Sequence, residues 1–240
     1  MVREESGWIL SLMEAIILAG GLGTRLQQVV SDLPKSLAPI AGRPFLEILL
    51  AFLARKQFTR VILSVGFMSE KIVEHFGDHY AGMALVYEIE REPLGTGGAI
   101  RAALTQCRSD HVFVFNGDTY CDLDVEGLER TWQHGRGPIV VAREVSDSTR
   151  FGRVEIVGER ITAFREKGVS GAGLINAGCY VLPSHALNAF PLGQKFSLET
   201  EYLAREAGRI YFTGFITRGR FIDIGVPEDY ARAQIELANL

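Results

Sequence analysis

A cluster of glycines followed by two cationic residues lies near the start of the chain. Gly20, Gly21 and Gly23 form a loop, and Arg25 and Lys35 come after it. Glycines let the backbone approach a phosphate closely and present several N–H donors to it. Two cationic side chains can bind a polyphosphate. These residue types favour a phosphate-binding loop. Glycine spacing alone also fits a tight strand-to-helix turn with solvated charges.

Three familiar active-site motifs do not fit the chain. A dinucleotide-binding fingerprint needs a third glycine where the chain has Leu26, which weakens a dehydrogenase interpretation. A Walker A loop needs Gly-Lys-Ser/Thr, whereas Lys35 follows Pro34. The chain also has no Gly-x-Ser-x-Gly elbow, so acyl hydrolysis is not supported.

The segments around the loop alternate between strands and helices. Apolar runs and helical spacing predict alternating strands and helices at 15–19, 44–53, 61–65, 69–76, 84–89, 97–107 and 111–115. This alternation predicts an open parallel sheet with helices on both faces. Ligands of such sheets bind at the carboxyl ends of strands, where both the Gly20 loop and Asp118 lie.

The second half of the chain is less regular. Its pattern predicts strands over 138–142, 151–157, 160–164, 175–182, 210–212 and 220–224, and helices over 197–207 and 227–238. No linker, repeat or low-complexity tract appears, so we expect a single domain over 14–240 whose later strands extend the first sheet. We expect residues 1–13 to form an N-terminal extension, and Met13 is an alternative start.

Composition restricts the class of protein. The 240 residues are 47% hydrophobic with a net charge of −4, which excludes a disordered chain. The 25 Lys and Arg against 29 Asp and Glu argue against a nucleic-acid-binding face. No apolar run reaches the roughly 18 residues of a membrane span. The 3 scattered cysteines do not suggest zinc and favour a cytoplasmic protein.

Six ordered segments resemble the sugar-1-phosphate nucleotidyltransferase family. They are Leu18–Leu26 with Pro34–Ser36, Glu92–Ala99, Asn116–Asp118, Glu166–Lys167, Asn176–Gly178, and Phe221–Tyr230. The resemblance implies a Rossmann-like, three-layer α/β/α fold with a mixed, mainly parallel sheet. It also implies an enzyme that transfers a nucleotidyl group from a nucleoside triphosphate to a sugar 1-phosphate and releases pyrophosphate.

The resemblance implies four catalytic residues and one metal. Asp118 and Asp223 are the implied Mg²⁺ ligands, because Mg²⁺ favours few carboxylates together with phosphate oxygens. A lone Gly-Asp would otherwise indicate a turn or a helix cap. Arg25 is implied to hold the β- and γ-phosphates, and Lys35 the α-phosphate. The sugar phosphate is already ionised near neutral pH, so no general base is expected.

The implied nucleotide-binding residues lie in the glycine loop and before the third helix. They are Leu18, Ala19, Gly20, Gly21, Gly23, Thr24, Glu90, Gly95 and Thr96. Glu90 is implied to read guanine, because a carboxylate can accept from N1–H and the 2-amino group together. The alternative is that Glu90 is one of several alternating charged residues on a strand and only faces solvent. At Ser36 and at Gly97–Gly98 the chain differs from the residues that are common in this family.

The implied sugar-phosphate residues come from later segments. They are Gly117, Glu166, Lys167, Asn176, Gly178 and Glu199. Lys167 is expected to bind the phosphate and Glu166 the sugar hydroxyls. Glu199 either reaches the sugar or lies on the surface beside a capping Ser197.

Three strings indicate a branch of the family. Val30–Lys35, Phe115–Tyr120 and Phe221–Asp229 resemble most the members that use GTP and a heptose 1-phosphate for surface glycans such as capsule or lipopolysaccharide. GTP and this sugar phosphate are therefore the expected partners, and a homodimer stays open. The alternatives are mannose 1-phosphate with GTP, glucose 1-phosphate or an amino sugar with dTTP or UTP, and a nucleotide-sugar-binding subunit without turnover.

Overall fold

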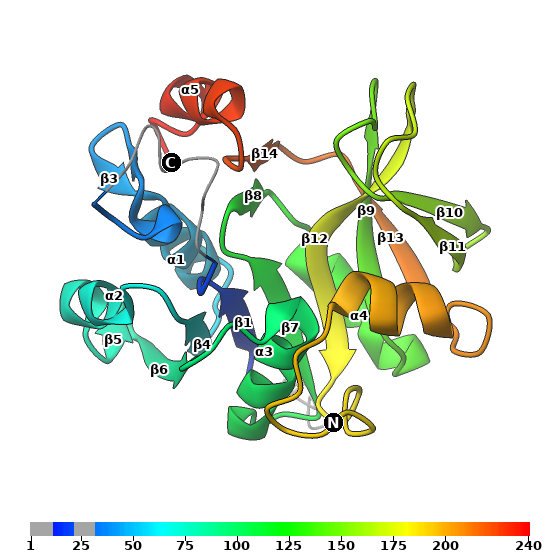
Figure 1. Ribbon diagram of the computed structural model, residues 1–240, viewed down its shortest axis with the longest axis horizontal. Helices are drawn as coiled ribbons and strands as arrows, with labels where there is room; N and C mark the ends of the chain where they lie inside the picture. Colours follow the sequence, from blue (N-terminus) through cyan, green and yellow to red (C-terminus); the bar gives the residue numbers. More distant parts are fainter. Residues whose placement is uncertain (1–11, 22–31) are drawn as a thin grey trace, which may run out of the picture.

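A ten-stranded mixed sheet forms the centre of the computed structural model, which describes residues 12–21 and 32–240 (Figure 1). Its strand order is β10-β11-β13-β9-β12-β7-β1-β4-β6-β5. The strands are β1 (Glu14–Leu18), β4 (Arg60–Val65), β5 (His79–Tyr80), β6 (Met83–Ile89), β7 (His111–Asn116), β9 (Ile139–Val145), β10 (Arg153–Val157), β11 (Arg160–Arg165), β12 (Gly173–Pro183) and β13 (Thr213–Thr217). Two short ladders pair β2 (Pro39–Ile40) with β3 (Arg43–Pro44), and β8 (Thr119–Cys121) with β14 (Phe221–Asp223).

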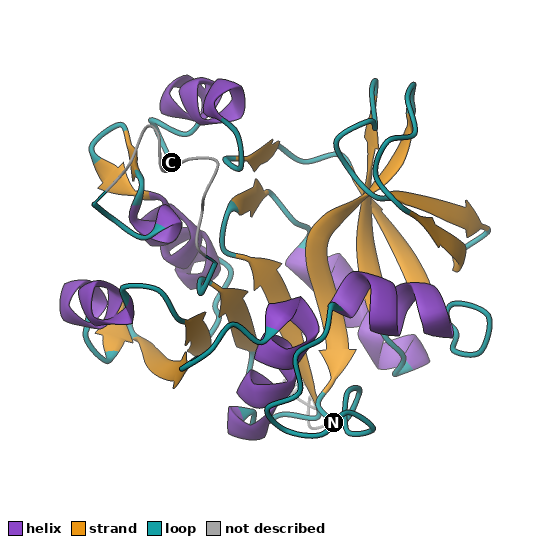
Figure 2. Cartoon of the chain, viewed as in Figure 1, coloured by secondary structure: helices purple, strands orange, loops and turns teal. Residues whose placement is uncertain are grey.

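Helices cover both faces of this sheet (Figure 2). They are α1 (Phe45–Arg55), α2 (Ser69–Phe76), α3 (Gly95–Ala103), α4 (Val125–Gly135), α5 (Pro227–Glu236), the 3₁₀-helices η1 (Lys35–Leu37) and η2 (Leu104–Gln106), and the π-helix η3 (Leu198–Ala204). Within residues 12–21 and 32–240, no helix has the length and apolar character needed to cross a membrane.

Strand β1 shows how the three layers form. Successive side chains of a strand point to opposite faces. Ile17 packs in the hydrophobic cluster that includes α1, α4 and α5, whereas Ile16 packs in the cluster of α3 and η3. Both side chains are fully buried. The expected three-layer α/β/α fold is therefore confirmed.

Parallel pairing is concentrated in the first half of the chain. Strand β1 pairs in parallel with β4 and β7, and β4 pairs in parallel with β6. Strand β12 lies antiparallel between β7 and β9, and β10 and β11 form an antiparallel hairpin. Strand β13 also pairs in parallel with β9, so the sheet is mixed as expected, and its adjoining parallel strands are concentrated in the first half.

Helix α4 and strand β13 differ from the sequence predictions, and the short strands β2, β3, β5 and β8 also have no predicted counterpart. Helix α4 has no counterpart among the predicted elements, although Asp124 caps it by accepting from the Gly127 N–H at 2.9 Å. The strand predicted over 210–212 instead begins at Thr213. Phe212 is buried before the strand starts, and a Cβ at Gly214 would lie 2.6 Å from the Ile156 side chain. A low-propensity glycine is therefore required inside β13.

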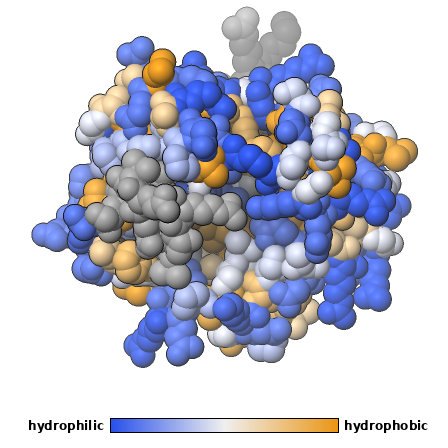
Figure 3. All heavy atoms as spheres, turned by 45° about the horizontal axis from the view of Figure 1, so that its top comes forward, coloured by the Kyte–Doolittle hydropathy of each residue, from blue (hydrophilic) through white to orange (hydrophobic). Residues whose placement is uncertain are grey.

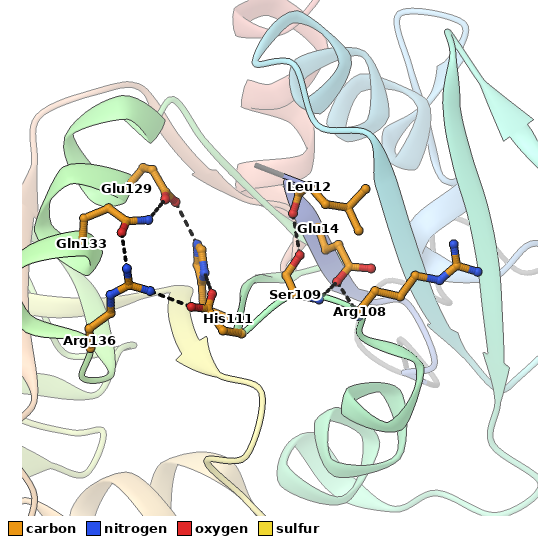
Figure 4. A network of polar contacts seen from close by, with 9 residues as sticks. Leu12, Glu14, Arg108, Ser109, His111, Glu129, Gln133 and Arg136 are labelled. Atoms are coloured by element: carbon orange, nitrogen blue, oxygen red, sulfur yellow. Dashed lines mark hydrogen bonds and ion pairs between the residues drawn. The ribbon is translucent and has the colours of Figure 1, made fainter. Parts of the chain in front are cut away.

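Polar networks fix the amino-terminal ends of β1 and β7 (Figure 4). The buried Glu14 carboxylate pairs with Arg60 at 2.6 Å and accepts the N–H groups of Arg108 and Ser109 at 2.7 Å. A buried charge is tolerated when it is paired and hydrogen-bonded in this way. These contacts lie at the opposite end of the strands from the Gly20 loop.

His111 forms a second network beside the first (Figure 4). Its ring nitrogens lie 2.6 Å from Asp110 and 2.8 Å from Glu129, and its ring stacks on Trp132 at 4.6 Å. Burial alone would lower the His111 pKa. The hydrogen bonds to Glu129 and Asp110 outweigh burial and raise the pKa above its ordinary value.

Candidate active site

The carboxyl ends of β1 and β7 place two predicted segments side by side. Leu18 is the register partner of Asn116, and the Gly117 N–H donates to the Leu18 carbonyl at 3.0 Å. A Cβ at Gly117 would clash with that same carbonyl, so glycine permits this close approach. The Gly20–Gly21 turn and Asp118 therefore lie at one edge of the sheet, as the strand pattern predicts.

The β8–β14 ladder brings Asp118 and Asp223 together from distant parts of the chain. Asp223 pairs in register with Thr119, the residue after Asp118. The Ile224 N–H donates to the Asp118 carbonyl at 2.9 Å. Lys35 Nζ lies 2.6 Å from Asp118 Oδ2, so one cation and two carboxylates meet at this edge.

The electrostatics of this group favour a bound cation. Burial and the charge of Asp118 raise the pKa of Asp223, while Lys35 opposes the shift. Two neighbouring carboxylates repel one another, and a divalent cation relieves that repulsion. Among residues 12–21 and 32–240, no group of three or more His, Cys, Asp or Glu side chains could hold a metal. Mg²⁺ fits a pair, because it takes one or two carboxylates plus phosphate oxygens.

A first cavity of about 470 Å³ opens beside the glycine turn. Its lining residues are Leu18, Ala19, Gly20, Gly21, Lys35, Ser36, Glu90, Pro93, Gly95, Thr96, Ala99, Asn116, Gly117 and Asp118. The structure thus gathers the described nucleotide-binding candidates in one place. Gly117, predicted on the sugar side, lines this cavity. Gly23, Thr24 and Arg25 lie outside the described residues.

Glu90 stands on the wall of the first cavity next to the glycine turn. Its Oε1 accepts from the Ser64 hydroxyl at 3.0 Å, and its Oε2 accepts from the Leu94 N–H at 3.0 Å. A Cβ at Gly20 would lie 2.6 Å from Oε1. The carboxylate is therefore held in one orientation, and each oxygen keeps a lone pair for a ligand.

The glycines that begin α3 make room for a distant segment. A Cβ at Gly95 would lie 2.6 Å from the Phe196 carbonyl, and one at Gly97 would overlap the Phe196 ring. Gly98 is equally close to the Gln194 carbonyl. Gly95 also has φ +71°, a conformation that glycine adopts without strain. Gly97 and Gly98 therefore serve packing against this segment.

A second cavity of about 760 Å³ adjoins the first and shares Thr96, Asn116 and Asp118 with it. The remaining lining residues are Thr119, Phe151, Gly152, Arg153, Phe164, Arg165, Glu166, Lys167, Asn176, Ala177, Gly178, Tyr180, Ser197, Glu199, Thr200, Ala204, Phe221 and Asp223. The predicted sugar-side residues other than Gly117 are among them. Hydrophilic residues cover most of the face shown in Figure 3, in which the top of Figure 1 is turned forward.

Glu199 connects the two cavities through hydrogen bonds. Its Oε2 accepts from the Thr96 hydroxyl at 2.7 Å and from the Ser197 hydroxyl at 2.8 Å. Ser197 also caps η3 by accepting from the Thr200 N–H at 3.3 Å. Ser197 therefore caps the helix as one interpretation expected, but Glu199 is partly buried and lines the cavity instead of lying on the surface. A contact between Glu199 and the sugar stays a prediction.

Several residues of the second cavity were not among the sequence predictions. Tyr180 is buried, and its hydroxyl accepts from Asn176 Nδ2 at 2.9 Å. Burial and the Glu199 charge raise the pKa of Tyr180 well above its ordinary value, so the phenol stays neutral. Phe151 and Arg153 precede or begin β10, where the apolar pattern indicates only a strand. The tertiary pairing of β10 with β12 brings them to the site.

Comparison with known proteins identifies the family. The model of the nucleotidyl transferase family matches residues 14–239, so the chain belongs to this family. It is 42% identical to a D-glycero-alpha-D-manno-heptose 1-phosphate guanylyltransferase of Aneurinibacillus thermoaerophilus, over 94% of this chain and 98% of the relative. A protein of the same name from Campylobacter jejuni is 41% identical over 91% of this chain and 97% of the relative. HddC from Yersinia pseudotuberculosis, solved in complex with GMP-PN, has a TM-score of 0.81 at 36% identity over 92% of this chain and 98% of that chain.

Proposed function

We propose that the chain transfers GMP from GTP to D-glycero-α-D-manno-heptose 1-phosphate and releases pyrophosphate. The observation that carries the proposal is the junction of two cavities at Thr96, Asn116 and Asp118. A nucleotide in the first cavity and a sugar phosphate in the second would meet at this junction. The activity of the two guanylyltransferase relatives supports this choice of substrates.

The reaction is a displacement at the α-phosphorus of GTP. An oxygen of the sugar phosphate forms the new P–O bond, and the bond to the β-phosphate oxygen breaks in line with it. The obstacle is the approach of two anions. Lys35 lines the first cavity and Lys167 the second, so cationic charge lies on both sides of the junction.

Asp118 and Asp223 are the residues that would hold Mg²⁺ in this enzyme. The raised pKa of Asp223, which burial and the nearby charge of Asp118 cause, supports this assignment. When bound, the ion would neutralise charge on the triphosphate and the leaving pyrophosphate. Arg25, proposed for the β- and γ-phosphates, lies outside the described residues.

Glu90 is the proposed guanine-reading residue. Its carboxylate is fixed by Ser64 and Leu94 at the cavity wall. Guanine presents adjacent N1–H and amino donors, and adenine does not present this pair, so a fixed carboxylate favours guanine. Glu90 lies next to Gly20, so this selection would take place beside the glycine turn.

Pyrophosphate release with Mg²⁺ tests the proposal across a matrix of substrates. GTP, ATP, UTP and dTTP are each paired with heptose 1-phosphate, mannose 1-phosphate and glucose 1-phosphate. The highest kcat/KM is expected for GTP with heptose 1-phosphate. A maximum with another pair would replace the substrates, and no release from any pair would reject the enzymatic proposal.

A further inference from the structure

The loop that carries Lys167 is held in place by the loop that precedes β10. Residues 166–172 connect β11 to β12, and residues 146–152 connect β9 to β10; the two loops stand side by side in the upper right of Figure 1. We propose that Arg153, which begins β10, is a positioning residue that fixes loop 166–172 and thereby places Lys167 for the sugar phosphate. This inference rests on the proposed function of the second cavity.

The Arg153 guanidinium contacts the end of loop 166–172 directly. Its Nη2 donates to the carbonyl of Gly171 at 3.1 Å and also to the carbonyl of Ala172. Both bonds come from the one nitrogen Nη2, whose two hydrogens are fixed in the guanidinium plane, whereas a lysine ammonium rotates freely. A Cβ at Gly173 would lie 2.6 Å from Arg153 Nε and 2.9 Å from Cζ. Gly173 therefore leaves the space in which the guanidinium lies.

Further hydrogen bonds join loop 146–152 to loop 166–172. The fully buried Ser148 hydroxyl lies 2.7 Å from the Val169 carbonyl and 3.0 Å from the Gly171 carbonyl. The Gly168 N–H donates to the Thr149 carbonyl at 2.9 Å. Ser148 and Thr149 thus hold Gly168, Val169 and Gly171, and Arg153 adds a second contact to Gly171 and one to Ala172, where the loop returns into β12.

The charge of Arg153 distinguishes it from an ordinary structural arginine. Its register neighbour Arg165 pairs with Glu155 at 2.8 Å. Arg153 forms no ion pair with a carboxylate in the part of the chain that the structure describes. Its Nε is buried without a hydrogen-bond partner there, an arrangement that does not favour folding. Arg153 also lines the second cavity, where its positive charge, which Asp147 offsets in part, attracts a phosphate dianion.

The expected consequence is a selective loss of sugar-phosphate binding. Displacement of loop 166–172 moves Lys167 but leaves the first cavity and its glycine turn intact. Arg153→Met should raise the KM for the sugar 1-phosphate about tenfold and change the KM for GTP by less than about twofold. Arg153→Lys keeps the positive charge but lacks the planar guanidinium that donates to both carbonyls, so its effect should be intermediate. Gly173→Ala should reproduce the Arg153→Met effect, because the new Cβ occupies the guanidinium's space.

Hydrogen exchange measures the positioning role without any substrate. Amides of loop 166–172 should exchange about tenfold faster in Arg153→Met and in Gly173→Ala than in the wild-type protein, while amides of residues 93–99 remain unchanged. Arg160→Met is the matched control, since Arg160 lies on the adjacent strand β11 and lines neither cavity. It should leave both the exchange rates and the two KM values unchanged.

The outcomes separate this inference from the proposed function. Unchanged exchange in both variants overturns the inference, whatever the activity of the enzyme. An unchanged sugar-phosphate KM, equal increases in both KM values, or wild-type behaviour of Arg153→Lys in both assays also overturns it. Failure of the proposed function appears differently, as a wild-type protein that releases no pyrophosphate from any substrate pair, and the exchange experiment still decides the positioning role.

Discussion

Lys35 and Asp118 are 83 positions apart in the chain, and their side chains form an ion pair of 2.6 Å between Nζ and Oδ2. The pair joins η1, which follows the glycine-loop segment, to the turn after β7. The two side chains are only 15% and 36% exposed, so solvent screens the pair less than it screens a surface salt bridge. A cation and a carboxylate are thus both fixed where two cavities meet.

Replacement of Lys35 tests the proposed phosphate contact. Lys35→Met should lower kcat/KM about 10²- to 10³-fold, because it removes preorganised positive charge from the reacting phosphates. Initial rates of pyrophosphate release measure the effect. Lys71→Met is the charge-matched control, because Lys71 lines neither cavity and its Nζ donates to the Asp32 carbonyl at an exposed position. Equal kcat/KM values for Lys35→Met and the wild type would rule out the assigned role.

Glu90 should determine which base the enzyme prefers. Glu90→Gln removes one of the two equivalent acceptors, so the ratio of kcat/KM for GTP over ATP should fall about tenfold. Glu88→Gln is the control, since Glu88 lies two residues earlier on β6 and lines neither cavity. Selectivity that stays at the wild-type ratio in Glu90→Gln would remove this residue from base recognition.

Glu199 should act on the sugar side of the site. Its Oε2 accepts from Thr96 and Ser197, which fixes the carboxylate in the second cavity. Glu199→Gln should raise the KM for the sugar 1-phosphate about tenfold with little change in the KM for GTP, because charge-assisted bonds to hydroxyls are lost. Glu159→Gln, in the exposed turn between β10 and β11 and lining neither cavity, is the control. A larger effect on the KM for GTP would contradict the assignment.

His111 should make stability depend on pH at the end of the sheet opposite the site. Its folded-state pKa is raised above the ordinary 6.5, so its stabilisation is complete below that value and is lost as pH rises through the folded-state pKa. His111→Gln should therefore lose roughly 1–3 kcal/mol at about pH 5.5 and less at about pH 8.5. Asp110 and Glu129, whose pKa values are lowered by His111, stay ionised at both values. Urea unfolding that gives the same difference at both pH values would disprove this dependence.

The first half of the fold could be predicted because its physical signals are local. The buried strands β1 and β4 appear in the sequence as largely apolar runs, and Gly20 follows the end of β1. Pro44 precedes α1, as expected for a residue at a helix start. The side-by-side position of the Gly20 turn and Asp118 followed from the rule for parallel strand ends.

The second half depends on contacts that the sequence does not display. Gly214 lies inside β13 because Ile156 from another strand needs its space, and polar threonines bound that strand. Arg153 and Tyr180 reach the second cavity through the antiparallel pairing of β12. Secondary-structure propensity carries no information on which strands pair. From the sequence, these residues are therefore predicted only as strand residues and not as cavity residues.

The central claim is that the sugar phosphate attacks the α-phosphorus of GTP at the junction of the two cavities. Isotope tracing tests this claim most directly, with GTP labelled at the α-phosphate in one reaction and at the γ-phosphate in another. With heptose 1-phosphate, the α-label should move quantitatively into the GDP-sugar and the γ-label into pyrophosphate. An α-label that remains in GTP or appears in free GMP, or a γ-label transferred to the sugar, would contradict the account.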